Sequence, residues 1–467
     1  MTEAIKDIHP DTLNRAVKMA IDSGEAATIE DAYRLFAQYR LSVSLSAEAA
    51  RSPAHQVALL TIVNAGRRAF LGGVHVWGDL EAALAINLPG ATLRDAVLAH
   101  GGQPANAAPE AGPVILLGEH GPVASSLALQ ATFSGLACGV FPAGEGERLP
   151  EETSAILPAI LAGALAMSEL FQNVRGNPMA GLREVGLSLW DPAADWRSAN
   201  NPGTYFIPDR LWILGLGHLG QALVWILGLL PFEDPAAIQL TLQDFDQLTL
   251  ANDSTSVLTT AALVGDRKTR ATAAWAEARG FRTRLVERRF SGDVRLQEDD
   301  PRVAFCGVDN AAARAALEDA GFDLVVEAGL GGGPKEYLAM RLHTFPATRT
   351  ARSIWTTGGE ADDAALSASA YRDLEARGLD KCGLVELATR TVGAPFVGLV
   401  AASLALGEMI RRLGGKPGIE VFDLTLRDTT LRRIVATTTN LQAINPGFVE
   451  IHSSRAGVLP KKEAAAS

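Results

Sequence analysis

One short segment constrains the fold more than any other: the glycine sequence GLGHLG, from Gly215 to Gly220. An apolar run typical of a buried strand leads into it at 211–215, and an apolar helical segment follows at 221–229. In this setting the first glycine permits a tight turn, Gly217 lets a phosphate or ribose approach the backbone, and the helix N-terminus supplies N–H groups. The pattern predicts a nucleotide site; the alternative is a glycine turn kept only for close packing of helix on strand.

Strand signals alternate with helical or turn-rich segments after this loop. Further strands are predicted at 238–244, 283–290, 303–308, 324–328 and 337–342, a buried helix at 391–407, and a late strand pair at 419–426 and 433–439. Such alternation is typical of an α/β fold with a doubly wound, mostly parallel sheet.

The first part of the chain shows a weaker α/β pattern without a glycine fingerprint. A helix is predicted at 55–70, strands at 73–77 and 114–118, and two short helical stretches before residue 40. The segment AGALAMSEL, which contains Glu169, lines up with AASLALGEM, which contains Glu408. This match indicates an internal duplication, although alanine-rich helices also produce such matches by chance.

Polar residues that suit a nucleoside triphosphate follow the glycine loop. Asp244 ends the next strand, where a carboxylate can accept both ribose hydroxyls, and Asp246 is the competing candidate. Lys268 could neutralise phosphates, Asn252 could donate a hydrogen bond to them, and Asp309 could hold Mg²⁺. Each residue alone could be an ordinary surface residue, whereas together they favour chemistry on the phosphates of ATP.

These motifs resemble the ubiquitin-activating enzymes and their bacterial ThiF-type relatives, which adenylate the C-terminal glycine of a ubiquitin-like or sulfur-carrier protein. The resemblance spans about residues 208–415 and lies in ILGLGHLG, the DFD at 244–246, Asn252, the G-x-x-K at 265–268, and the VDN that ends in Asn310. Within the family, the chain looks most like the activating component of bacterial ubiquitin-like conjugation operons of the Bil type, which are linked to defence against phage.

The resemblance implies a pseudo-dimer of two Rossmann-like halves. An inactive adenylation-like domain with N-terminal helices would span 1–190 and a linker 191–209. The active domain would span 210–440 with a cysteine-bearing segment at 344–390, and a tail would span 441–467.

The resemblance also implies ATP and Mg²⁺ as cofactors. Asp244 would contact the ribose, Asn252 and Lys268 the phosphates, Asp309 the Mg²⁺, and Gly215, Gly217, Gly220 and Asn310 would complete the nucleotide site. The family usually has an arginine three residues after the asparagine, where this chain has Thr255. Either Arg267 or Arg270 replaces it, or an arginine of the other half does, or adenylation is weakened.

The chain has three cysteines, too few for a disulfide framework or for the two CxxC zinc pairs common in the sulfur-carrier branch, so no zinc is expected. Cys138 and Cys306 lie in apolar runs and are predicted to be core thiols. Cys382 follows Lys381 and precedes a potential short helix, whose N-terminus would favour a thiolate. We expect Cys382 to be the thioester cysteine; the alternative is a packing residue.

The predicted function is ATP-dependent activation of a ubiquitin-like protein at its C-terminal glycine. Cys382 would then form a thioester and pass the protein to a conjugating enzyme. The alternatives are an NAD-dependent Rossmann oxidoreductase and a non-catalytic scaffold with this fold. A net charge of −11 without a basic run argues against nucleic-acid and membrane partners, and the N-terminal sequence lacks a secretory signal, so a cytoplasmic location is expected.

Overall fold

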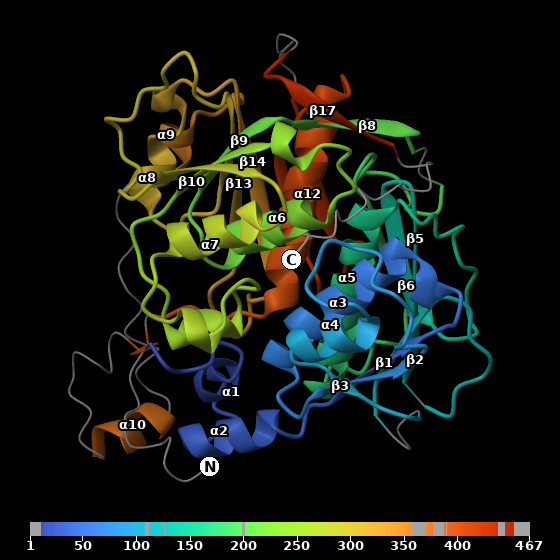
Figure 1. Cartoon of the computed structure of the whole chain (residues 1–467). Coiled ribbons are helices and arrows are strands. Elements are labelled where there is room, and N and C mark those ends of the chain that lie inside the picture. Colours follow the sequence, from blue (N-terminus) through green and yellow to red (C-terminus); the bar gives the residue numbers. More distant parts are fainter. Residues whose placement is uncertain are drawn as a thin grey trace, which may run out of the picture.

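The computed structural model describes residues 11–107, 112–125, 127–198, 201–355, 369–376, 387–388, 390–437 and 444–452. In this part of the chain, two large mixed sheets lie side by side with helices packed between and around them (Figure 1). The α/β prediction of two Rossmann-like halves is confirmed.

The first sheet belongs to the N-terminal half. Its five leading strands are parallel and its last two antiparallel. The order across the sheet is β3 (Gln103–Pro104), β2 (Val74–Gly78), β1 (Leu41–Leu45), β4 (Val114–Leu117), β5 (Ala128–Ser134), β6 (Ala137–Pro142) and β7 (Val185–Ser188).

The second sheet repeats this plan and adds one strand. Five parallel strands are again followed by antiparallel ones. The order is β11 (Arg282–Val286), β10 (Gln239–Gln243), β9 (Arg210–Leu214), β12 (Val303–Cys306), β13 (Leu324–Leu330), β14 (Ala339–Phe345), β15 (Ile419–Thr425) and β16 (Arg432–Ala436).

Four helices fill the space between the sheets and carry one continuous apolar core: α3 (Pro53–Ala69), α5 (Ile156–Val174), α6 (His218–Leu229) and α12 (Pro395–Leu413). Pro53 and Pro395 begin α3 and α12, where a missing N–H costs nothing. The α5 sequence is long and apolar enough to cross a membrane, yet 94% of that stretch is buried inside the protein. Its alanines and single glycine allow α3 to pack closely against it.

Smaller helices surround this centre. They are α1 (Lys18–Asp22), α2 (Ile29–Phe36), α4 (Leu93–Ala99), α7 (Lys268–Glu277), α8 (Ala311–Ala315), α9 (Ala351–Ile354) and α10 (Ser369–Ala376), with short 3-10 helices at Ala49–Arg51, Pro235–Ala237, Leu250–Ser254, Ala261–Leu263 and Glu318–Ala320. Although α1 and α2 begin the chain, they lie next to α10, which comes from the C-terminal half (Figure 1).

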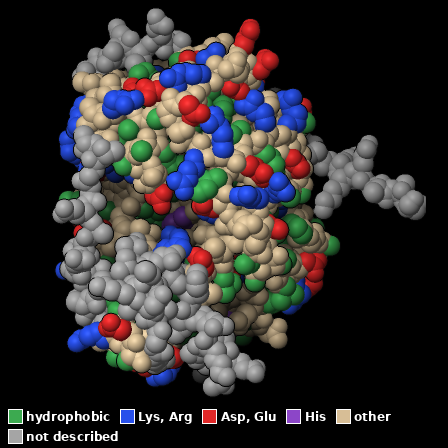
Figure 2. All heavy atoms as spheres, turned by 90° about the vertical axis from the view of Figure 1, so that its left-hand side faces the viewer, with side chains coloured by type: hydrophobic (Ala, Val, Ile, Leu, Met, Phe, Trp, Pro, Cys, Tyr) green, Lys and Arg blue, Asp and Glu red, His purple; other side chains and the backbone are tan. Residues whose placement is uncertain are grey.

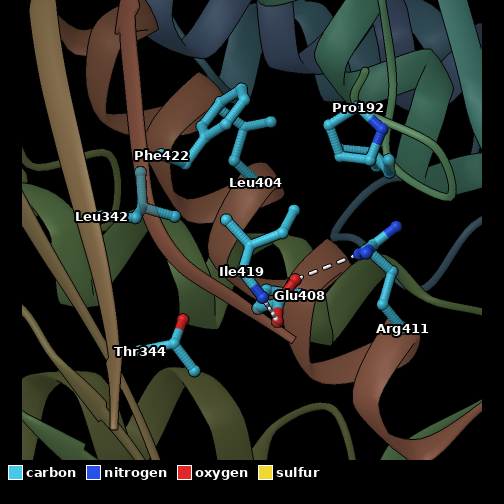
Figure 3. A pocket seen from close by; sticks show the side chains of 9 residues that line it. Pro192, Leu342, Thr344, Leu404, Glu408, Arg411, Ile419 and Phe422 are labelled. Carbon is cyan, nitrogen blue, oxygen red and sulfur yellow. Dashed lines mark hydrogen bonds and ion pairs between the residues drawn. The ribbon is translucent and has the colours of Figure 1, made fainter. Parts of the chain in front are cut away.

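The predicted echo between Glu169 and Glu408 corresponds to the same place in both halves. Helices α5 and α12 each join the sixth and seventh strands of their sheet. Glu408 accepts hydrogen bonds from the backbone N–H of Ile419 at 2.8 Å and from Nε of Arg411 at 3.1 Å (Figure 3). Glu169 accepts from the N–H of Gly181 at 2.9 Å and is bound by Arg183 through two nitrogens. Each carboxylate thus ties its helix to the segment that begins the seventh strand.

The structure contains strands that the sequence did not predict, among them β5, β6 and β7 of the first sheet. β1 lies at the centre of the first sheet, but its sequence LSVSL was not predicted as a strand. β8 (Thr204–Pro208) lies within the stretch expected to be a linker, and it pairs with β17 (Phe448–His452) from the expected tail. These two segments are therefore joined as an antiparallel ribbon, and each supplies the backbone partners that the other lacks.

Candidate nucleotide site

The glycine turn joins β9 to α6 at the carboxyl edge of the parallel strands. Gly215 has a φ of +85°, a backbone conformation that residues with a side chain rarely adopt. A Cβ on Gly220 would lie 2.0 Å from the carbonyl oxygen of Gly215, so this position must be a glycine for the turn to close. A Cβ on Gly217 would meet no atom within 4 Å, so this glycine borders open space. Two glycines therefore build the turn, and the third leaves the backbone accessible at the start of α6.

Asp244 is placed against this turn. Its Oδ2 accepts a hydrogen bond from the N–H of Leu216 at 2.7 Å, and its Oδ1 accepts from the N–H of Asp246 at 2.9 Å. The carboxylate is half-buried at the end of β10 and keeps further lone pairs for a ligand. The structure therefore favours Asp244 over Asp246 as the group beside the glycine turn.

Lys268 begins α7 and is mostly buried. Its Nζ forms an ion pair with Oδ2 of Asp246 at 2.8 Å, and its backbone N–H donates to the carbonyl of Asp246. The neighbouring Arg267 donates to the carbonyl of Phe245 and so also stays close to this loop. Arg270 instead pairs with both oxygens of Glu287 and is exposed. Of the two local candidates for the missing family arginine, Arg267 is therefore the one held beside the 244–246 loop.

Asn252 lies in the short 3-10 helix Leu250–Ser254. Its Oδ1 accepts from the N–H and the hydroxyl of Thr249, which fixes the amide so that its nitrogen is the group left to donate. Thr255, at the position of the family arginine, is buried. This stretch is held by the N-terminal half, because Arg67 of α3 binds both oxygens of Asp253.

Asp309 and Asn310 follow β12 on the same edge of the sheet. Asp309 is exposed, whereas Oδ1 of Asn310 accepts the N–H of Ala313 at 3.0 Å and caps α8. The structure thus gives Asn310 a helix-capping role. Among the described residues, no group of three or more His, Cys, Asp or Glu side chains gathers as a metal site would require. Asp309 alone could hold Mg²⁺ only together with phosphate oxygens, which is the usual mode for that ion.

Arg15 is the residue that reasoning from the sequence missed. It precedes α1 in the N-terminal segment, yet its backbone N–H donates to the hydroxyl of Ser254 and its Nη1 donates to the hydroxyl of Thr391. Burial lowers its pKa, as does nearby Arg390, while Asp309 acts in the opposite direction. Its buried Nε has no acceptor among the described residues. Arg15 is thus a candidate for the arginine from the other half that the sequence left as an option, and no local pattern distinguishes it.

Figure 2 shows the side of the molecule that carries α1, α7 and α8. This face is hollowed, and basic and histidine side chains are visible in the hollow.

His218, the first residue of α6, packs against α12, where its Nε2 lies 3.4 Å from the carbonyl of Pro395. Burial lowers its pKa to about 4, so it is neutral at pH 7.

The equivalent place in the N-terminal half has a longer loop in place of the glycine turn. Between β1 and α3 the chain runs through 46–52, a longer loop than the glycine turn. It packs so closely that a Cβ on Gly118 would lie 2.4 Å from Oγ of Ser46. Gln56 corresponds to Gln221, since each binds the carbonyl of the loop before its helix. By that alignment His55, which pairs with Glu151 at 2.7 Å, stands where the other half has Gly220.

Two of the cysteines, Cys138 and Cys306, are free thiols in the core. Cys138 and Cys306 are buried, and burial raises the pKa of both thiols, that of Cys306 to about 12. They are therefore protonated at neutral pH, as their apolar surroundings in the sequence indicate. Cys382 lies outside the described residues.

The described flanks of the Cys382 segment are anchored to the N-terminal segment that carries Arg15. Before it, the hydroxyl of Tyr371 in α10 donates to Oδ1 of Asp22 at 2.5 Å. After it, the carbonyl of Ala388 accepts from Nζ of Lys18 at 3.3 Å. Both flanks thus contact α1, which follows Arg15 by three residues.

Comparisons with known proteins give one strong result. The family model described as the BilD C-terminal domain matches residues 207–416, and that of the BilD N-terminal domain matches 40–189. The "Bacterial E1-like protein BilD" of Collimonas sp. (strain OK412) is 46% identical over 416 residues, which cover 88% of this chain and 90% of that protein.

Solved structures give weaker matches. PaaA is 19% identical with a TM-score of 0.33, over 49% of this chain and 72% of that chain. Escherichia coli MccB, crystallised with MccA-N7isoASN, is 12% identical with a TM-score of 0.32, over 50% of this chain and 66% of that chain. Both scores are too low to bear on the site.

Proposed function

This chain belongs to the BilD family of bacterial E1-like proteins, and we propose that it activates the C-terminal carboxylate of a ubiquitin-like protein with ATP. One observation carries the proposal: Arg15 of the N-terminal half donates to the hydroxyl of Ser254, two residues after Asn252, and its charge interacts with that of Asp309 in the C-terminal half. A site that draws cations from both halves suits a triphosphate, whereas hydride transfer has no evident need of them.

The residues fit a nucleotide. Gly217 borders open space at a helix N-terminus, which favours a phosphate, and Arg15 has a buried Nε without an acceptor among the described residues. We assign the ribose to Asp244 and the phosphates to Lys268, Asn252 and Arg15. Mg²⁺, bound to Asp309 and to the phosphates, would neutralise charge on the triphosphate.

The reaction places two anions next to each other, the carboxylate of the ubiquitin-like protein and the α-phosphate of ATP. The carboxylate oxygen bonds to the α-phosphorus and pyrophosphate leaves with the electrons of the broken P–O bond. Lys268 and Arg15 reduce the repulsion between the two anions and hold them for in-line attack. Lys268 must exchange its present partner, Asp246, for phosphate when ATP binds.

For the second step we propose Cys382 as the thioester cysteine. Its thiolate would attack the acyl carbon and release AMP, and the ubiquitin-like protein would pass from there to a conjugating enzyme. The anchoring of both flanks to α1 supports this assignment, because α1 begins three residues after Arg15. We further propose that the protein works in the cytoplasm as part of a conjugation system that defends against phage.

The first test is exchange of labelled pyrophosphate into ATP, with a ubiquitin-like protein ending in glycine and encoded beside this chain. We expect Lys268→Ala and Arg15→Ala to lower the exchange rate by about 100-fold or more, since each removes a charge that faces the reacting phosphate. Arg270→Met is the matched control, because it removes an arginine that pairs with Glu287 instead. Equal activity in all variants would contradict the assignment, and an absence of ATP binding to the wild type would favour a scaffold.

The second test concerns the cysteines. Cys382→Ala should retain pyrophosphate exchange yet form no adduct that dithiothreitol releases, whereas Cys138→Ala should form it normally. Cys138 is a suitable control because its thiol is buried in the first sheet. A dithiothreitol-sensitive adduct on Cys382→Ala would rule out this thiol.

A further inference from the structure

A second hollow lies between the two halves, at the opposite end of α6 from the glycine turn. Its cavity volume is about 60 Å³, and it opens to solvent. The hollow is separated from the glycine turn by helix α6, over about 18 Å. Its walls are mainly aliphatic, aromatic and proline side chains, among them Ile86 and Ile156 of the N-terminal half and Leu230, Phe232 and Phe281 of the C-terminal half. None of the described residues that line it is an Asp, a Glu or a Lys.

Among the described residues, Arg279 is the one charged side chain that lines this apolar hollow. Arg279 is only 6% exposed, and its guanidinium lies over the ring of Trp275, 3.4 Å from the ring centroid. Its Nη1 donates to the carbonyl of Trp275 at 2.8 Å, while its Nε finds no acceptor among the described residues. Burial lowers its pKa to about 9, and no neighbouring carboxylate raises it. Arg279 is therefore a fixed, buried cation at pH 7.

Buried cations in proteins are normally paired, because desolvation of an unpaired charge costs several kcal/mol. Other buried arginines in this chain follow that rule: Arg68 pairs with Asp253 and Arg411 with Glu408. Arg279 pairs with no carboxylate among the described residues and instead borders a space that could admit one. An apolar pocket with one converging polar group is also the usual form of a small-molecule site.

We propose that this hollow binds a small molecule with an aliphatic body and a carboxylate, whose oxygens Arg279 binds. Stacking on Trp275 holds the guanidinium plane, so its free N–H groups can meet two carboxylate oxygens side by side. The aliphatic body lies against Ile86, Leu230 and Phe232. This site is separate from the nucleotide site and requires neither ATP nor a ubiquitin-like protein.

Hexanoate is a suitable probe, with 1-hexanol and inorganic phosphate as the two partial ligands. We expect hexanoate to change tryptophan fluorescence saturably, with a Kd on the order of 1 mM for so few heavy atoms, because Trp275 stacks on Arg279. Hexanol, which lacks the charge, and phosphate, which lacks the aliphatic body, should each bind about tenfold more weakly or worse. Phosphate binding as tight as that of hexanoate would overturn the aliphatic part of the proposal.

The decisive variant is Arg279→Met, which keeps an unbranched chain about as far as the Nε position and removes the charged guanidinium. It should lower hexanoate affinity about tenfold or more while the melting temperature without ligand stays equal or rises, because an unpaired buried charge is removed. Arg270→Met, which removes an exposed arginine from α7, the helix that precedes Arg279, should bind hexanoate as the wild type does. Unchanged binding by Arg279→Met, or no saturation by the wild type about 50-fold above 1 mM, would overturn the proposal.

A second variant guards against an effect of Arg279 on folding. Ile86→Glu sets a carboxylate in the wall of the same hollow, next to the exposed Asn87, and should suppress hexanoate binding by occupying Arg279. If Arg279→Met does not fold and Ile86→Glu still binds hexanoate like the wild type, the hollow is not the binding site.

Discussion

At the scale of single residues, the glycine turn separates a structural from a functional requirement. A methyl group at Gly220 would overlap the carbonyl oxygen of Gly215, whereas one at Gly217 would meet no atom within 4 Å. We expect Gly220→Ala to lower the free energy of unfolding by about 2–4 kcal/mol. Gly217→Ala should leave that free energy almost unchanged but weaken ATP binding, because the methyl enters the space offered to a phosphate. Urea unfolding and titration calorimetry with ATP distinguish the two effects.

The residues of the candidate nucleotide site differ in whether the sequence alone can predict them. The glycines, Asp244 and Lys268 could be predicted because each follows a strand or turn at a characteristic spacing. Arg15 could not, because its place depends on a contact with Ser254 across more than 200 residues of sequence. Asn310 was predicted to bind the nucleotide, and the structure shows that its side chain caps α8.

At the scale of elements, helices α5 and α12 each carry one buried carboxylate that binds the helix to the segment leading into the next strand. Burial raises the pKa of Glu408 from 4.5 to about 7. Between pH 4.5 and 7 the folded chain keeps a proton on Glu408 that the unfolded chain releases. The contribution of this protonated carboxyl to the free energy of unfolding is therefore full below pH 4.5 and is lost as pH rises through 7. The loss is on the order of 3 kcal/mol. Glu408→Gln cannot ionise, so its free energy of unfolding should not fall in this window.

The matched control is Glu169→Gln at the equivalent place in α5. Arg183 loses a carboxylate that binds it through two nitrogens, whereas Arg411 also donates to the carbonyls of Trp190 and Pro417 and keeps those partners in Glu408→Gln. We therefore expect Glu169→Gln to be the more destabilised variant at pH 8. Urea unfolding from pH 5 to 8 tests both; parallel curves for wild type and Glu408→Gln would disprove the role of Glu408.

Elements were predictable where hydrophobic pattern and chain order agree. The central strands β9, β10, β12 and β13 are short apolar runs that end at turn residues, and the sequence places them within a few residues. The strand β1 is missed because its serines, which are buried in the sheet, make LSVSL look half polar. The ribbon of β8 and β17 is missed because neither segment has a partner nearby in the sequence.

At the scale of the whole molecule, the two halves share polar contacts that neither could satisfy alone. Arg68 of α3 is buried, and its Nη2 donates to the carbonyls of Val257 and Thr259 in the other half. Nδ2 of Asn64 also donates to the carbonyl of Val257, and Nε1 of Trp225 donates to the hydroxyl of Thr61. The segment that these contacts hold lies shortly after Asn252, so the N-terminal half supports the candidate nucleotide site of the other half.

Arg68 and its neighbour Arg67 provide a matched test of this support. Arg68→Met leaves the carbonyl of Thr259 without that donor in a buried interface, and should lower the free energy of unfolding by about 2–4 kcal/mol. Arg67→Met should cost less than about 1 kcal/mol, because Arg67 is partly exposed and Asp253 retains Arg68 at 3.2 Å. Since the core is continuous across both halves, tryptophan fluorescence and far-ultraviolet circular dichroism should report one shared transition. Two separate transitions in Arg68→Met would mean that each half is stable without this contact. Equal losses of unfolding free energy in Arg67→Met and Arg68→Met would mean that the Arg68 contact gives no particular support.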